Sequence, residues 1–174
     1  MDTTLKVPLS ERINTRMLVF VAVLVGLIGF PIYVYLHELM TGGKVYLSDG
    51  TVKVDLKAMS TFEMDQARGT MNDVPPQWRE LDGKRVILEG EIWQPREANG
   101  SITDFQLVYS IQKCCFSGPP KVQHFVDATV INDKKVFYYS GPVRVAGTLH
   151  VNVKNEAGKV TSVYQVDVES VDPV

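Results

Sequence analysis

A long apolar run near the N-terminus is the strongest pattern in the chain. Residues 17–39 read MLVFVAVLVGLIGFPIYVYLHEL, and residues 17–36 contain no charged side chain. About 20 apolar residues, at 1.5 Å per helical residue, span the ~30 Å hydrocarbon core of a bilayer. A cleaved signal peptide has a shorter apolar region of about 7 to 15 residues. The pattern therefore predicts a retained transmembrane helix over 17–39, surrounded by the lipid bilayer.

Charged residues on the two sides of this helix predict its orientation. The preceding tail, residues 1–16, carries three basic residues, Lys6, Arg12 and Arg16. Only Lys44 follows the helix closely. Basic residues collect on the cytoplasmic side of a membrane, so the tail is predicted to be cytoplasmic and residues 40–174 to be exported. In a bacterium this places the helix in the inner (cytoplasmic) membrane and the C-terminal domain in the periplasm.

Residues 40–82 are predicted to be an extracytoplasmic arm or linker that contains a hairpin. Residues 43–57, GKVYLSDGTVKVDLK, alternate apolar and polar positions around Asp49-Gly50. An Asp-Gly pair between alternating segments is a strong hairpin signal. We expect this hairpin to lie against the main domain. The pattern of residues 58–82 does not distinguish helix from loop.

Residues 83–174 show repeated alternation typical of β-strands. Predicted strands cover residues 85–93, 102–110, 124–131, 136–139, 143–153 and 162–171. Gly90 and Gly147 lie inside two of them, Gly90 suggesting a bulge or bend, and such glycines let strands coil sharply enough to close a small barrel. The fold class is therefore mainly β, with an N-terminal transmembrane helix followed by a small OB-like antiparallel β-barrel; a compact sandwich is the alternative. The positions expected to face inward are Val86, Leu88, Ile92, Phe105, Leu107, Phe125, Val130, Val143, Val145, Leu149, Tyr164, Val166 and Val168.

Composition narrows the classes of function. The formal net charge is −2, with 22% charged and 45% hydrophobic residues. No basic stripe is present, so the chain lacks the cationic surface that nucleic-acid binding ordinarily uses. Serine-hydrolase, P-loop and dinucleotide-binding motifs do not occur. We therefore expect no nucleic-acid partner, and we expect a binding or assembly module rather than an enzyme.

The segment QKCCFSGPPKVQHFV, residues 112–126, holds the only two cysteines. Cys114, Cys115 and His124 are candidate ligands for zinc or copper, since two thiolates and an imidazole would leave one open position. Adjacent side chains of an extended backbone point apart, however, and zinc signatures space cysteines as C-x2-C. A strained, reducible vicinal disulfide and a pair of buried thiols are the other interpretations. A thiol enzyme with Cys115 as nucleophile and His124 as base is the weakest hypothesis.

This loop, CCFSGPP followed by QHFV, resembles the bacterial periplasmic family called domain of unknown function 3299. The resemblance covers roughly residues 78–171 and includes LDGKRVILEG upstream and GPVRVAGTLHV downstream. It implies an OB-like fold on the periplasmic side of a membrane with no established activity. Some members occur beside export-type transporters implicated in zinc handling. Members are secreted or lipid-anchored, whereas this chain has a full apolar helix.

We expect the chain to be a single-pass membrane-anchored binding or assembly module, an accessory subunit of a larger membrane protein complex. Its partners would be integral membrane protein subunits. The expected contacts are Gly26 and Gly29 in the helix and Phe116, Gly118, Pro119 and Pro120 in the loop. A periplasmic metal-binding accessory protein linked to transport is the alternative. Aromatic residues such as Trp93 and Tyr109 are sufficient to line a binding groove, although such residues more often pack in a core.

Overall fold

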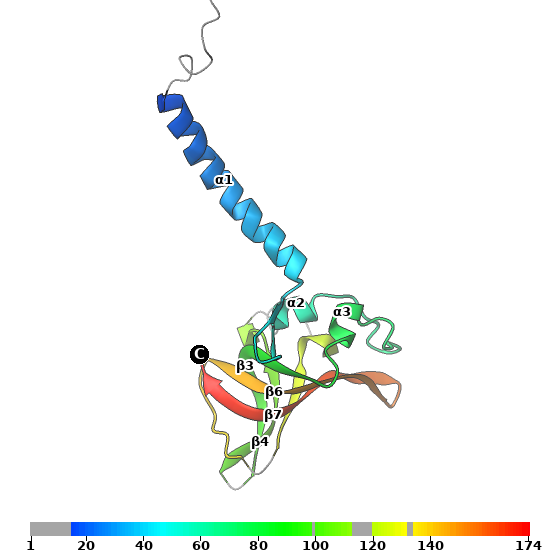
Figure 1. The fold of residues 1–174 in the computed structure, drawn as a ribbon. Coiled ribbons are helices and arrows are strands. Elements are labelled where there is room, and N and C mark those ends of the chain that lie inside the picture. The colour runs from blue at the N-terminus through cyan, green and yellow to red at the C-terminus, as the bar shows by residue number, and fades with distance from the viewer. Residues whose placement is uncertain (1–14, 99, 113–119, 132–133) are drawn as a thin grey trace, which may run out of the picture. The chain divides into compact units, whose positions relative to one another are not determined.

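The computed structural model describes residues 15–98, 100–112, 120–131 and 134–174. The chain divides into two compact units, with the boundary between Thr41 and Gly42 (Figure 1). The first unit contains a helix, and the second contains the sheet together with short helical segments.

The N-terminal helix, α1, covers Thr15–Thr41 and extends the predicted range by two residues at each end. Its stretch Thr15–Leu36 is long and apolar enough to cross a membrane, and it is the only such helix among the described residues. Pro31 lies inside the helix. An added Cβ at Gly26 or Gly29 would meet nothing within 4 Å, so both glycines present open surface. The predicted apolar helix is confirmed.

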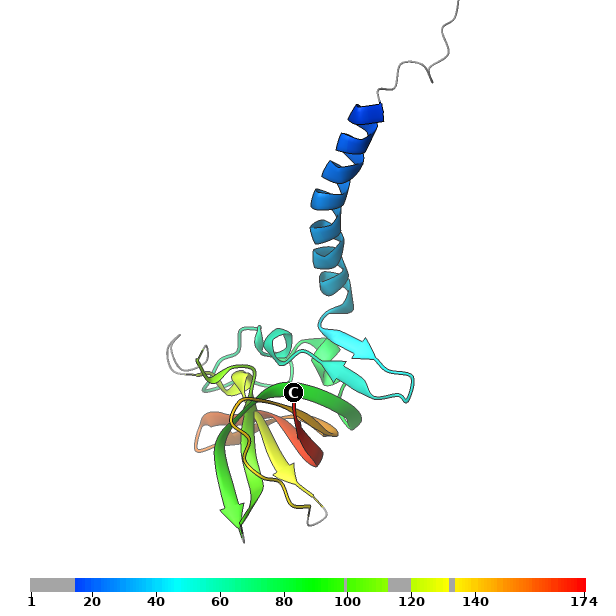
Figure 2. The same cartoon turned by 90° about the vertical axis from the view of Figure 1, so that its left-hand side faces the viewer.

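The predicted hairpin is also confirmed. Strands β1 (Lys44–Tyr46) and β2 (Val52–Val54) pair antiparallel. In the turn, the Thr51 amide donates a hydrogen bond of 3.0 Å to Asp49 Oδ1, and Gly50 has a φ of 80°. Because β2 also pairs in parallel with β3 (Lys84–Ala98), the hairpin lies against the main sheet as expected (Figure 2).

The segment that follows the hairpin contributes to the core of the second unit. Asp55 caps α2 (Leu56–Ser60) by accepting hydrogen bonds from the amides of Lys57 and Ala58, and α3 (Pro76–Arg79) follows a turn-rich stretch. The buried hydrophobic side chains of this region are Leu56, Met59, Met64, Val74, Trp78 and Leu81. Residues 42–82 therefore fold together with the strands in one unit.

The remaining strands are β4 (Ser101–Val108), β5 (Val126–Val130), β6 (Pro142–Glu156) and β7 (Lys159–Pro173). The sheet order is β1-β2-β3-β4-β5-β7-β6, and β6 pairs in addition with β3. Hydrogen bonding thus passes from β3 through β4, β5, β7 and β6 and returns to β3, and we call these strands the five-strand ring. The β2–β3 and β5–β7 pairings are parallel. The mainly β fold is confirmed, but the expectation of purely antiparallel pairing is wrong for these two contacts.

Two predicted strands differ from the structure. Residues Val122–His124 form a 3-10 turn, η2, so the strand predicted over 124–131 begins at Val126. Phe125 follows this turn and is only half-buried, whereas Val126 and Ala128 supply the buried positions. Val130, also expected inside, is half-buried against the core. The strand predicted over 136–139 is reduced to an isolated bridge between Val136 and Ile102. The other predicted inward residues are buried.

The two strand glycines permit close backbone approach. A Cβ at Gly147 would lie 2.2 Å from the Asp167 carbonyl oxygen, beside a register shift between Ala146 and Gly147. A Cβ at Gly90 would lie 2.4 Å from the Val108 carbonyl oxygen. The β3–β6 register continues through Gly90 without interruption, so the bulge suggested there is wrong.

Candidate functional site

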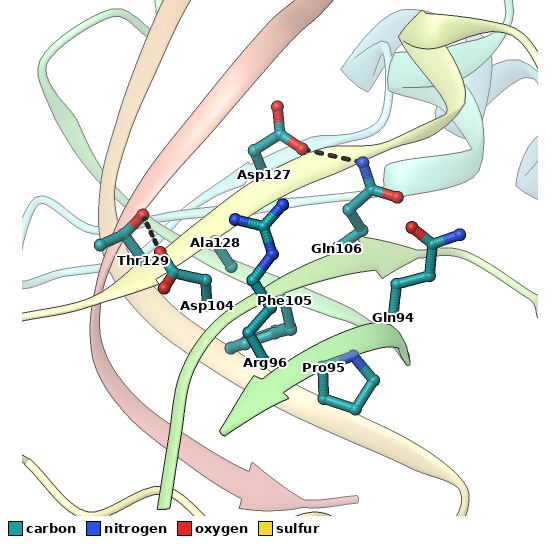
Figure 3. A pocket seen from close by; sticks show the side chains of 9 residues that line it. All are labelled: Gln94, Pro95, Arg96, Asp104, Phe105, Gln106, Asp127, Ala128 and Thr129. Carbon is teal, nitrogen blue, oxygen red and sulfur yellow. Dashed lines mark hydrogen bonds between the residues drawn. The ribbon is translucent and has the colours of Figure 1, made fainter. Parts of the chain in front are cut away.

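A cleft of about 500 Å³ lies on the outer face of β3, β4 and β5 (Figure 3). Each strand contributes two outward polar side chains, which are Gln94 and Arg96, Asp104 and Gln106, and Asp127 and Thr129. The intervening Phe105 and Ala128 are buried beneath them. A volume of this size falls within the range of small-ligand sites, roughly 300–1,000 Å³.

A bulge in β3 brings Arg96 to this cleft. Trp93 pairs with Gln106 and Arg96 pairs with Asp104, so two residues of β3 oppose one residue of β4. The first of these two residues, Gln94, has a φ of 46°, in the left-handed region that residues other than glycine rarely adopt. Bulges redirect side chains and are frequent next to functional sites. Here the bulge places Gln94 and Arg96 on the cleft face, as Figure 3 shows.

The two carboxylates of the cleft are held by neutral donors from neighbouring strands. Gln106 Nε2 donates to Asp127 Oδ1 at 3.0 Å, and Thr129 Oγ1 donates to Asp104 Oδ1 at 3.1 Å. Both pairs join residues that stand directly opposite each other on β4 and β5. These cross-strand hydrogen bonds fix the carboxylates and leave their second oxygens available as acceptors.

Arg96 differs from the other charged residues of the cleft. Within the described part of the chain, its guanidinium has neither a hydrogen bond nor an ion pair within 4.0 Å, although Asp104 stands opposite it. A guanidinium offers five N–H donors in a planar fork. The cleft therefore presents guanidinium donors that no described residue occupies, beside fixed carboxylate acceptors.

The predicted ligand His124 lies at a second cavity, of about 350 Å³, together with Phe62, Glu63, Tyr109 and Lys121. Lys121 Nζ forms an ion pair with Glu63 at 2.8 Å. Burial, and then the nearby charge of Lys121, lowers the pKa of His124 below its ordinary value of 6.5, while Glu63 opposes this. His124 Nδ1 is buried and has no hydrogen-bond partner among the residues that the structure describes.

The remaining predicted loop residues are placed only in part. Cys114, Cys115, Phe116, Gly118 and Pro119 lie outside the described residues, so ligation of a metal by the cysteines stays a prediction. Pro120 is described and is exposed. In the described ranges there is no group of three His, Cys, Asp or Glu side chains that could hold a metal.

The sequence pattern did not indicate that the cleft residues form one site. Asp104, Gln106 and Asp127 occupy the polar positions of alternating strands, which the pattern assigns to solvent. Pro95 was the available signal, because a proline inside a strand is typical of a bulge or an edge. Only the pairing of β3, β4 and β5 brings these side chains together.

Comparison with known proteins finds a similar solved structure. No family model and no curated protein matches the chain. Among solved structures, the chain is similar to the crystal structure of a DUF3299 family protein from Pseudomonas aeruginosa PAO1, with 25% sequence identity and a TM-score of 0.45. The match covers 55% of this chain and 64% of that one, so this chain spans less than two thirds of that protein. The resemblance to domain of unknown function 3299 that the loop predicted is confirmed.

Proposed function

We propose that the chain is a single-pass membrane-anchored extracytoplasmic binding and assembly module, acting as an accessory subunit of a larger membrane protein complex. The apolar surface of α1 carries this proposal. None of its most apolar window is buried within the chain, and Leu27 and Phe30 are 71% and 69% exposed. A helix that is apolar on all sides needs a bilayer or other helices around it. The second unit has its own core and needs no such cover.

The orientation follows from the charges that flank the helix. The basic residues of the tail favour a cytoplasmic N-terminus in a bacterial inner membrane, which leaves the unit Gly42–Val174 in the periplasm. Within that unit, the return of hydrogen bonding to β3 supports an OB-like barrel, since the OB fold is a partly open Greek-key barrel of five strands.

The partner contacts would come from both units. Gly26 and Gly29 present open helix surface and would permit another transmembrane helix to approach. The loop that contains Phe116 and Pro119, together with residues 43–76, would contact the extracytoplasmic part of the partner.

Membrane fractionation of the full-length chain in a bacterium with two membranes tests the anchor. We expect the protein to resist carbonate extraction and a C-terminal tag to be digested only after the outer membrane is opened. The double variant Leu24→Arg with Leu27→Arg should abolish insertion, because a charged side chain at the bilayer centre costs about 2.5–3.5 kcal/mol on insertion scales. The matched variant Leu24→Ala with Leu27→Ala should stay in the membrane. A soluble wild-type protein, or one whose intact mass shows removal of the helix, would contradict the proposal.

Purification in a mild detergent tests the accessory role. We expect fixed integral membrane subunits to accompany the wild-type protein, and Gly26→Leu with Gly29→Leu to reduce their recovery. Recovery of the anchored protein without companions would refute this part of the proposal while leaving the anchor intact.

A metal-binding accessory protein is the alternative. His124 supports it, because its Nδ1 is buried without a partner among the described residues. Zinc or copper would be held by His124 with Cys114 and Cys115, which lie outside those residues.

A further inference from the structure

We propose that the cleft on β3, β4 and β5 is a binding site for a neutral saccharide. The proposal goes beyond the module function and does not depend on the membrane anchor, because all the cleft residues belong to the unit Gly42–Val174. It rests on the arrangement of charges, on the position of the cleft in the sheet, and on the neighbouring Trp93.

The charges of the cleft disfavour simple ions. An anion would meet Arg96 but would be repelled by Asp104 and Asp127, and a cation would be attracted by the two carboxylates but repelled by Arg96 beside them. No contact within 4.0 Å neutralises the guanidinium among the described residues. Uncharged hydroxyl groups suit this arrangement, because each hydroxyl both donates and accepts hydrogen bonds. Adjacent hydroxyls of a sugar would accept from Arg96 and donate to the free carboxylate oxygens.

The position of the cleft disfavours an extended peptide. A peptide that adds a strand needs the unpaired edge of a sheet. β4 is paired with β3 on one side and with β5 on the other, so its main chain is already bonded at the cleft. Recognition there must come from outward side chains, which are the polar groups labelled in Figure 3.

Trp93 adds an apolar surface beside these polar groups. It stands directly opposite Gln106, and directly paired residues project from the same face of a sheet. The neighbouring Ile92 points into the core, and Trp93 is half-buried. An indole ring combines a large apolar face with a polar edge, which suits the C–H face of a sugar ring.

Trp93 also provides the reporter for the test. The other tryptophan, Trp78, is only 1% exposed, so a ligand in the cleft should change the emission of Trp93 alone. Full-length protein in detergent is titrated with cellotetraose and with tetra-N-acetylchitotetraose, both uncharged, and binding is followed by fluorescence and by calorimetry. We expect saturable binding of at least one of them, with an emission change that is lost in Trp93→Phe.

Variants distinguish the cleft from other surfaces. Arg96→Ala should weaken binding about tenfold or more, since hydrogen bonds to charged groups contribute about 1.5–3 kcal/mol. Arg144→Ala is the matched control, because Arg144 pairs with Glu89 on β3 and β6 away from the cleft, and it should leave binding unchanged. Arg96 is exposed, so its loss should not affect folding, which thermal unfolding verifies.

Three results would overturn the proposal. The first is that neither oligosaccharide binds at concentrations up to about 10 mM, far above a millimolar dissociation constant. The second is equal weakening by Arg96→Ala and Arg144→Ala. The third is Arg96-dependent binding of a charged peptide, such as tetralysine or tetraglutamate, in place of the sugars.

Discussion

Gly147→Ala tests the way in which the five-strand ring is held together. Gly147 lies on β6 and pairs with Val86 on β3 and with Val168 on β7. An added Cβ would lie 2.2 Å from the Asp167 carbonyl oxygen and 3.1 Å from Val166 Cγ2. Ordinary contacts of a Cβ are 3.4–4 Å, so β6 and β7 would have to separate by about 1 Å. The obstructing oxygen belongs to the backbone and cannot rotate away.

The expected cost follows from two opposing effects. Inserting a methyl group into a well-packed site costs about 1–3 kcal/mol. Alanine lowers the entropy of the unfolded chain relative to glycine, which returns about 0.4–1 kcal/mol. The free energy of unfolding should therefore fall by about 1–2 kcal/mol. For a unit of this size each kcal/mol lowers Tm by about 4 °C, so Tm should fall by about 4–8 °C.

Thermal unfolding of the full-length protein in detergent, followed by the far-ultraviolet circular dichroism of the strands, measures this change. Gly29→Ala is the control, because nothing lies within 4 Å of an added Cβ there and the residue belongs to the other unit. It should leave the unfolding of the sheet unchanged. A Tm for Gly147→Ala equal to or above that of the wild type would show that β6 and β7 do not approach as closely as described.

Three further predictions concern buried or loop side chains. Tyr164 Oη donates a hydrogen bond to the Met59 carbonyl at 3.3 Å, and burial raises the pKa of this phenol, which is therefore neutral. Tyr164→Phe removes only this hydrogen bond and should lower the free energy of unfolding, measured in urea, by about 1 kcal/mol. The pKa of His124 is lowered in the folded state, so the unfolded chain binds more protons below about pH 6.5, and the free energy of unfolding should fall as the pH drops from 6.5 through the native pKa. His124→Gln should remove this loss of stability between about pH 7 and 5.5. An unchanged dependence of stability on pH in this variant would contradict the burial of His124. Elemental analysis should give the same zinc and copper contents for the wild type and for the double variant Cys114→Ser with Cys115→Ser, because adjacent cysteines are poor joint ligands. A metal content that falls in the double variant would favour the metal-binding alternative.

The elements that could be predicted from the sequence are those with local signals. The apolar run of α1 and the Asp49-Gly50 turn each determine their own structure within a few residues. The alternation of β3, β4, β6 and β7 is also local, and it located their buried faces correctly. These signals need no knowledge of which strands become neighbours.

The errors occur where tertiary structure overrides local alternation. Phe125 and the aromatic stretch 136–139 have strong strand propensity. Phe125, however, directly follows the 3-10 turn η2, and in the stretch 136–139 only Val136 forms a bridge with another strand. Strand propensity reflects packing on a sheet surface, so it misleads where no neighbouring strand is available. The burial of Trp78 and Leu81 could not be predicted for the same reason, because their partners are distant in sequence.

The cleft shows most clearly why a candidate site can escape sequence analysis. Arg96 and Asp127 are separated by 31 positions in the chain and look like ordinary solvated residues of two strands. Their proximity depends on the β3–β4–β5 pairing and on the one extra residue of the bulge at Gln94-Pro95, which changes the face on which Arg96 stands. A regular strand without the bulge would reverse the alternation after Trp93, because a shift of one residue moves every following side chain to the opposite face. Deleting Pro95 should therefore remove the bulge and leave Arg96 two residues after Trp93, opposite Asp104 in the cleft, while Gln94 comes to stand opposite the buried Phe105 and turns towards the core.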